Sequence, residues 1–358
     1  MKLWRLLLKS VLFFAVLNLL LVAIAPGFGF TLSIYNALVP GRERLPFGES
    51  PAAYNLSLFD LDAMFAAHEI AAPKAVDEFR VVVIGDSSVW GTLLDNDETL
   101  TGQLDLGQNI RIYNLGYPTI SLTKDLLILQ KALDYEPDLI VWMMTLEAFP
   151  QDKQLTVPLV QNNATRVREL VSVYGLDADP NSDVLTHPDV WDTTLIGRRR
   201  ALADWYRLQV YGVMWGITGV DQVYPESYTP AQVDFEADTS FHEITEAEFT
   251  PDFLALNALD VGVALAGDTP IVLVNEPILI SNGENSDLRY NFFYPRWAYD
   301  QYRDLLQEKA DMNGWTYYDL WDVVPMDEFT NSAVHLTADG EALLASDVAE
   351  LILTESAE

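Results

Sequence analysis

Residues 79–91 read FRVVVIGDSSVWG, an apolar run followed by a short polar stretch. The first six residues, Phe79–Ile84, form an apolar and β-branched run of the length expected for a strand that is buried on both faces. The run then breaks into a tight, polar turn. A serine just past the carboxyl end of a central parallel strand lies where open α/β sheets place their chemistry, so Ser87 is a candidate nucleophile. Aspartate and serine are also the preferred N-cap residues, and the stretch alone fits a plain helix cap equally well.

Two further motifs follow along the chain. Asn114 and Gly116 stand in RIYNLGYP, directly after a second short apolar run, and His335 stands in NSAVHLTADG, before a helical segment at the end of the chain. With Gly-Asp-Ser after the first strand, this order resembles that of the SGNH, or GDSL-type, hydrolases. The resemblance implies that Ser87 attacks an ester carbonyl and that His335 is its general base. It also implies that the N–H groups of Ser87 and Gly116 hold the oxyanion.

The chain departs from the family's pattern at two positions. The third motif, Gly-x-Asn-Asp, is replaced by residues 145–148, Thr-Leu-Glu-Ala, so the oxyanion asparagine is missing. Three residues before His335, where the family has an aspartate, the chain has Ser332. The partner of the histidine is therefore open between a carboxylate from elsewhere and a backbone carbonyl, and an inactive site is the third alternative. The candidate carboxylates are Asp322, Asp327, Glu147 and Glu276.

The alternation of apolar and amphipathic segments predicts a series of strands and helices. The strand candidates are residues 79–84, 109–114, 138–144, 270–275 and 315–319. The helix candidates after the first strand include residues 121–134, 295–312 and 337–352. Short apolar strands separated by amphipathic helices predict a parallel sheet that is covered on both faces. The family resemblance implies a flavodoxin-like three-layer α/β/α sandwich with five parallel strands.

Further polar residues are expected near Ser87, because the carboxyl ends of parallel strands share one edge of the sheet. Asn275 and Glu276 follow the fourth strand candidate. The side chains expected around the site are Asp86, Asn114, Glu147, Asn275, Glu276 and Asp327. The chain has no cysteine and its four histidines do not stand at the spacings of a zinc site, so neither a metal nor a cofactor is expected.

A long segment, about residues 149–269, separates the third and fourth strand candidates and exceeds a plain crossover. Within it, Ile196–Val220 reads as an apolar and aromatic helix with three arginines near its start. Three interpretations are open for this helix. It is a buried helix of the insertion, a cap over the site, or an interfacial helix that faces the membrane or a membrane partner, with its arginines near headgroups or an anionic substrate.

The N-terminus predicts a membrane segment. Three basic residues among the first nine precede residues 10–41, which hold no charged residue, and Val11–Phe30 is long enough to cross a bilayer core of about 30 Å. The basic flank favours an N-terminus in the cytoplasm and a body outside it. A cleaved signal peptide is the alternative, because residues 23–25 read Ala-Ile-Ala, although Pro26 directly after them disfavours cleavage.

We therefore expect three parts: a cytoplasmic leader and membrane anchor (residues 1–41), a stalk with a short helix (42–78) and an SGNH-type hydrolase domain (79–358). The chain carries 21 Lys and Arg against 53 Asp and Glu, a net charge of −32, and such a surface repels nucleic acid. The expected function is that of an extracytoplasmic, membrane-anchored serine esterase whose substrate is an O-acylated small molecule or cell-surface glycan. The alternatives are an O-acyltransferase of a cell-surface polysaccharide with a membrane acyltransferase as partner, and a catalytically inactive SGNH-fold binding or scaffold protein.

Overall fold

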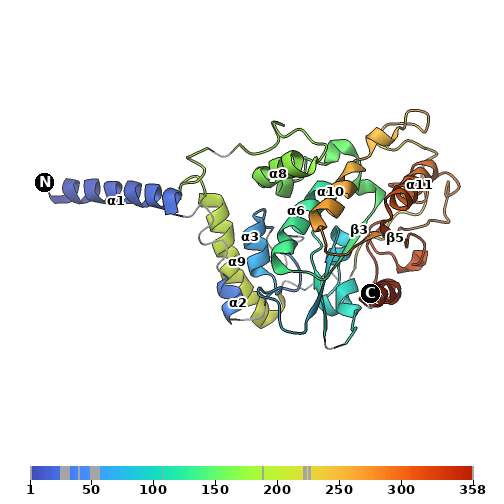
Figure 1. The fold of residues 1–358 in the computed structure, drawn as a ribbon, viewed down its shortest axis with the longest axis horizontal. Coiled ribbons are helices and arrows are strands. Elements are labelled where there is room, and N and C mark those ends of the chain that lie inside the picture. The colour runs from blue at the N-terminus through green and yellow to red at the C-terminus, as the bar shows by residue number, and fades with distance from the viewer. Residues whose placement is uncertain are drawn as a thin grey trace.

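The computed structural model describes residues 2–24, 33–38, 41–48, 57–107, 109–187, 189–220, 224 and 227–356, and Figure 1 shows how their helices and strands are arranged. Five strands form one parallel sheet in the order β2-β1-β3-β4-β5. They are β1 (Phe79–Ile84), β2 (Ile110–Asn114), β3 (Leu139–Met144), β4 (Ile271–Asn275) and β5 (Thr316–Asp319). All five strand predictions are confirmed to within one residue at each end.

Helices cover both faces of this sheet. On one face, Val82 and Ile84 of β1 join an apolar core with α3, α6, α8, α10 and α11, and on the other, Val81 and Val83 pack with α5 and α12. Since successive side chains of a strand point to opposite faces, this is the burial of a central strand, and the predicted three-layer sandwich is confirmed. The helices of these layers are α3 (Leu61–Ala67), α5 (Leu100–Gln103), α6 (Leu122–Ala132), α8 (Ala164–Tyr174), α10 (Asn257–Ala266), α11 (Arg296–Asn313) and α12 (Ala338–Glu355).

The long segment between β3 and β4 is only partly an insertion. Its last helix, α10, is apolar, and it packs against α6 in one layer of the sandwich. A parallel crossover from β3 to β4 needs a helix on the face of the sheet, and α10 meets this need. The remaining helices of the segment are α7 (Pro158–Asn162), α8 and α9 (Arg199–Thr218).

The predicted helix at residues 196–220 is α9, and it is not a buried helix. Leu208, Gln209 and Trp215 are buried, whereas Tyr206 and Ile217 are exposed. The helix packs beside α2 (Ile34–Leu38), on the side of the body from which α1 (Lys2–Ile24) extends (Figure 1).

The N-terminal helix is confirmed as a helix, and residues 3–20 within it are long and apolar enough to cross a membrane. The end of the predicted span and its Ala-Ile-Ala site reach into residues 25–32, outside the described residues. In the predicted stalk, residues 49–56 also lie outside them, and the short helix is α3. His68 at its C-terminal end is buried, and its Nε2 contacts the carbonyl oxygens of Glu43 and Asn114, so it is a core histidine.

Two buried carboxyl groups lie between α12 and the sheet, where they line one small cavity beside Ser88. Burial raises the pKa of Glu341 to about 8. The pKa of Glu276 lies well above its usual value because of burial and the nearby carboxylate of Asp86. Because Glu341 ionises near pH 4.5 in the unfolded chain, folding takes up a proton at neutral pH. The free energy of unfolding therefore falls as the pH rises from about 4.5 to 8.

Glu341→Gln should remove this pH dependence, because an amide needs no proton to be buried. We expect the variant to gain roughly 3 kcal/mol in free energy of unfolding relative to the wild type between pH 5 and pH 8. Thermal unfolding of the full chain in detergent at both pH values measures the effect, with the exposed Glu350→Gln on the same helix as control. An equal effect of Glu341→Gln at pH 5 and pH 8 would contradict the buried, neutral side chain.

Candidate active site

The first motif forms the turn between β1 and α4 (Ser87–Trp90). A Cβ on Gly85 would lie 2.5 Å from the Val89 side chain and 3.2 Å from the Met143 carbonyl oxygen, so only glycine fits between α4 and β3. The Asp86 carboxylate accepts the Ser88 N–H at 2.9 Å and caps α4. The cap interpretation of this stretch is therefore confirmed, and it leaves the Ser87 side chain available for another contact.

That contact is made by His335, in the loop before α12. Its Nε2 lies 2.7 Å from Ser87 Oγ, and its Nδ1 lies 2.8 Å from Asn331 Oδ1. Because an amide oxygen can only accept, Nδ1 carries the ring proton and Nε2 accepts the Ser87 hydroxyl. The Thr330 N–H donates to the His335 carbonyl at 2.8 Å, and this closed loop places Asn331 beside the ring. The structure thus brings Ser87 and His335, the two residues singled out in the sequence, within hydrogen-bond distance of each other.

Electrostatics keep the His335 ring neutral. Burial lowers its pKa to about 4, and the carboxylate of Asp86 opposes this shift in part. At neutral pH the ring is therefore in the state that a general base requires. Asn331 orients the ring but has no charge, so it cannot stabilise an imidazolium as an aspartate would.

The predicted alternatives for the histidine's partner are both wrong. Within the part of the chain that the structure describes, the Nδ1 partner is neither a carboxylate nor a backbone carbonyl but the Asn331 amide. Asp327 lies exposed in the turn Met326–Glu328, and Asp322 is exposed too. The fourth residue before the histidine, not the third, points at the ring, because the loop doubles back between Thr330 and His335.

The second motif supports α4 from the side of β2. Asn114 Nδ2 donates to the Val89 carbonyl at 2.6 Å, while its Oδ1 accepts the Gly116 N–H at 3.0 Å. A Cβ on Gly116 would lie 2.4 Å from the Trp90 nitrogen, so the loop passes directly against α4. Asn114 is thus a structural residue, and the Gly116 N–H is occupied. The Ser87 N–H, at the first position of α4, has no intrahelical acceptor and is the donor best placed for an oxyanion.

A buried ion pair lies under the turn. Lys124 is 0 % exposed, and its Nζ donates to the Gly85 carbonyl at 2.7 Å and to the Asp125 carboxylate. Trp142 Nε1 also donates to this carboxylate, at 3.2 Å. A fully buried lysine is stable only when it is paired, and here its pairing fixes the backbone one step before Asp86.

The third motif's position holds a different set of groups. Glu147, where the family has its oxyanion asparagine, pairs with Lys153 and contacts His242 Nε2 at 3.2 Å. Burial lowers the pKa of Lys153, and burial and Lys153 lower the pKa of His242, so the histidine is neutral at pH 7. The Glu147 N–H donates to Tyr294 OH at 3.2 Å. We call Glu147, Lys153 and His242 the β3-end cluster.

The two residues after β4 have separate roles. Asn275 accepts hydrogen bonds from Tyr299 OH and Tyr302 OH, each at 3.2 Å, and donates to Asp319 at 2.8 Å, so it holds α11 to the sheet. Glu276 accepts from Ser88 Oγ and thus supports α4 beside the nucleophile candidate. Both lie at the predicted edge of the sheet, but their side chains are hydrogen-bonded to residues other than Ser87 and His335.

Besides Lys153, the polar segment 231–242 of the insertion approaches this edge of the sheet. The Ala231 N–H donates to the Thr330 carbonyl at 2.8 Å, one residue from Asn331. At its other end, this segment brings His242 to the β3-end cluster. Helix α9 instead packs beside α2 and Arg42, and these contacts give no support to its interpretation as a cap.

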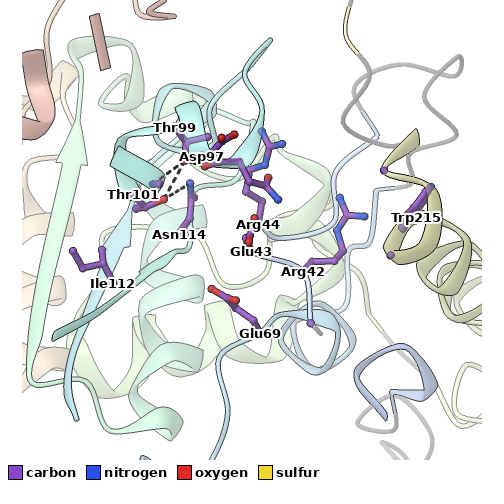
Figure 2. A pocket seen from close by; sticks show the side chains of 15 residues that line it. Arg42, Glu43, Arg44, Glu69, Asp97, Thr99, Thr101, Ile112, Asn114 and Trp215 are labelled. Atoms are coloured by element: carbon purple, nitrogen blue, oxygen red, sulfur yellow. Dashed lines mark hydrogen bonds between the residues drawn. The ribbon is translucent and has the colours of Figure 1, made fainter. Parts of the chain in front are cut away.

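A cavity of about 610 Å³ lies on the other side of Asn114 (Figure 2). Its lining includes Arg42, Arg44 and Trp215, and the Thr101 hydroxyl that accepts from Asn114 Nδ2 at 3.2 Å. Ser87 and His335 do not line it. The cavity is therefore separate from the Ser87–His335 contact.

Sequence reasoning missed four residues of this region: Lys124, Lys153, His242 and Asn331. Lys124 carried a signal, since it is a charge in the buried stretch of a helix. Asn331 carried a weaker one, as a hydrogen-bond acceptor close to the histidine. Lys153 and His242 reach Glu147 from 6 and 95 residues away, and no local pattern marks them.

Comparisons with known proteins gave no match to a family model and none to a curated protein. Among solved structures, the chain is similar to a carbohydrate acetylesterase from Sinorhizobium meliloti, with 13 % identity over 77 % of this chain and 99 % of that one and a TM-score of 0.37. It is similar to a lipolytic G-D-S-L family protein from Veillonella parvula, with 11 % identity over 76 % of this chain and 98 % of that one and a TM-score of 0.37. It is also similar to an aryl esterase from M. smegmatis, with 13 % identity over 77 % of this chain and 98 % of that one and a TM-score of 0.36.

These likenesses are distant. The sheet order, the turn at Ser87, the Asn-x-Gly loop and the histidine before α12 occur together in one structure. The chain has a parallel α/β fold, and these three motifs, in this order along the chain, resemble those of the SGNH/GDSL-type hydrolases.

Proposed function

We propose that the protein is a membrane-anchored serine esterase that acts on O-acyl esters. The observation that carries the proposal is the 2.7 Å contact between Ser87 Oγ and His335 Nε2, with Nδ1 held by Asn331. A hydroxyl, a neutral base and an acceptor that orients the base are the parts that acyl transfer to an enzyme needs.

The reaction proceeds in two halves. Ser87 Oγ attacks the ester carbonyl carbon while its proton passes to His335 Nε2. The carbonyl then re-forms, the alcohol leaves with the proton from His335, and the acyl group stays on Ser87. Water attacks this acyl-enzyme in the same way, with His335 again as base, and releases the carboxylic acid and the free serine.

The negative charge of the tetrahedral intermediate needs hydrogen-bond donors. The Ser87 N–H supplies one. The Gly116 N–H, which Asn114 Oδ1 accepts in the free protein, supplies a second donor when a bound substrate takes the place of Asn114 Oδ1 as its acceptor. Catalytic hydrogen bonds often form fully only when the substrate is bound. The family's third donor, an asparagine side chain, has no counterpart at Glu147.

For the substrate, we propose an O-acylated glycan. The β3-end cluster is one carboxylate, one ammonium and one neutral imidazole, so it offers donors and acceptors without a net charge. Such a set suits the hydroxyl groups of a neutral sugar better than an anion, and the net charge of −32 also disfavours polyanions.

The proposed location is an N-terminal anchor with the body outside the cytoplasm. Helix α1 spans 23 residues, about 35 Å, and its exposed side chains are largely apolar. Its basic residues lie near its N-terminal end, which favours a cytoplasmic N-terminus.

Hydrolysis of p-nitrophenyl acetate and of an acetylated xylo-oligosaccharide by the purified full chain tests the proposal. Ser87→Ala and His335→Ala should each lower the rate by at least about 10³, because each removes a reacting group. Ser172→Ala is the matched control and should keep activity, since Ser172 is an exposed serine on α8 whose hydroxyl contacts the Glu169 carbonyl.

Wild-type protein without activity on either ester would contradict the esterase proposal. Acetyl transfer to an added oligosaccharide in place of hydrolysis would instead assign an O-acyltransferase. A folded protein that binds acetylated oligosaccharide unchanged would be the inactive binding protein.

The neutral partner of His335 predicts an unusual pH profile. Since the pKa of His335 is lowered to about 4, the wild-type kcat/KM should fall only below about pH 4. Asn331→Asp places a carboxylate beside Nδ1, which favours the imidazolium, so the acid limb should move up by about 1–3 pH units and kcat should rise.

Asn331→Ala should instead lower kcat, by up to about 10⁴, because the ring loses its orientation. Asp327→Asn, at an exposed residue, is the control and should change neither kcat nor the pH of the acid limb. An acid limb near pH 6.5 in the wild type, unmoved by Asn331→Asp, would contradict the role of Asn331.

A further inference from the structure

The side chains of α9 divide into two opposite faces. Leu208, Gln209 and Trp215 point into the body, where the Arg42 guanidinium lies 4.5 Å from the centre of the Trp215 ring (Figure 2). On the opposite face, residues recur at spacings of three and four along the helix, as positions on one side of an α-helix do. These residues are Arg199, Ala203, Tyr206, Val210, Val213 and Ile217.

This outer face is apolar although it points away from the protein. Tyr206 is 63 %, Val210 49 % and Ile217 74 % exposed. A surface helix of a soluble domain normally has its polar residues on such a face. An exposed apolar stripe on a helix whose other face is packed therefore marks a surface that meets something apolar.

Helix α2 packs beside α9 and has an exposed apolar side of its own. The Ile34 N–H donates to Gln209 Oε1 at 2.6 Å, so the two helices are joined. Ile34 is 52 % and Leu38 67 % exposed, four residues apart and thus on one side of α2. We call the outer faces of α2 and α9 together the α2–α9 surface.

The charge at this surface is opposite to that of the whole chain. Residues 198–218 contain four arginines and a single aspartate, whereas the chain has 21 Lys and Arg against 53 Asp and Glu. Arg199 and Arg200 are exposed at the start of α9, and Arg207 is exposed on its flank. Cationic side chains beside an apolar stripe are typical of a helix that lies in the headgroup region of an anionic bilayer.

The chain itself keeps this surface near the end of α1. Helix α1 ends at Ile24 and α2 begins at Ile34, and ten residue steps span at most about 35 Å even when fully extended. In Figure 1, α1 extends from the side of the body on which α2 and α9 lie. If α1 crosses a membrane, α9 cannot be far from the lipid surface.

We propose that the α2–α9 surface docks onto the lipid bilayer in which α1 is anchored, with Tyr206, Val210 and Ile217 among the acyl chains and Arg199 and Arg200 at anionic headgroups. This inference rests on the proposed anchoring by α1 and is independent of the esterase activity. It selects the interfacial alternative for α9 over the buried helix and the cap.

Single-cysteine spin labels test the docking, because the natural chain has no cysteine. Tyr206→Cys, Val210→Cys and Ile217→Cys are labelled with a nitroxide in the full chain, which is then placed in nanodiscs of phosphatidylcholine and phosphatidylglycerol. Met312→Cys, 72 % exposed on α11, is the control in water, and Leu12→Cys, 64 % exposed on α1, is the control for the anchor.

Collisions with oxygen and with a nickel chelate measure the depth of each label. A label in the bilayer collides more often with oxygen and less often with the nickel chelate. We expect the ratio of these two collision rates at positions 206, 210 and 217 to be several-fold higher than at position 312 and to approach the ratio at position 12. Removing phosphatidylglycerol should lower the ratio at 206, and Arg199→Gln with Arg200→Gln should abolish this lipid dependence.

Ratios at 206, 210 and 217 equal to that at 312, with 12 in the bilayer, would overturn the docking and leave the anchor standing. A label at 12 that is also in water would overturn the anchor itself. Labels that are in water in nanodiscs and become shielded only in native membranes would overturn lipid docking in favour of a membrane protein partner.

Discussion

The candidate site depends on one constraint: the backbone must reverse between β1 and α4 within the space that a glycine leaves. Gly85 lies against both β3 and α4, and its carbonyl accepts from the buried Lys124. Asn114 holds α4 from the side of β2, and Glu276 holds it through Ser88. Each of these contacts comes from a different strand or helix, so the position of Ser87 is a property of the whole sandwich.

The charges around this turn explain the nature of the base. The site is crowded with buried carboxyl groups, and burial raises the pKa of two of them, well above its usual value for Glu276 and to about 8 for Glu341. The pKa of His335 is instead lowered, which favours its neutral form, because the effect of burial outweighs that of the Asp86 carboxylate. A neutral amide partner suits this state: it fixes the tautomer without adding a further carboxylate. The cost is a weaker base than a Ser-His-Asp triad provides.

The sequence was sufficient for the sheet and for the pair Ser87 and His335, for identifiable reasons. Each strand is a short apolar run, and the residues that follow parallel strands meet at one edge of the sheet. The partner of His335 was not predictable, because the choice of Asn331 over Asp327 depends on how the loop between β5 and α12 doubles back. The β3-end cluster was not predictable either, since Lys153 and His242 are brought to Glu147 by an irregular segment with no periodic pattern. For α9, the sequence predicted the helix, but only the structure shows which of its faces is packed.

The activation of Ser87 by His335 is tested most directly by locating a covalent adduct. The full chain is treated with a fluorophosphonate, digested, and the modified peptide is sequenced by mass spectrometry. We expect a single adduct on Ser87, which forms in the wild type and is lost in His335→Ala. No adduct on a folded wild-type chain, or an adduct on Ser88 that does not depend on His335, would contradict it.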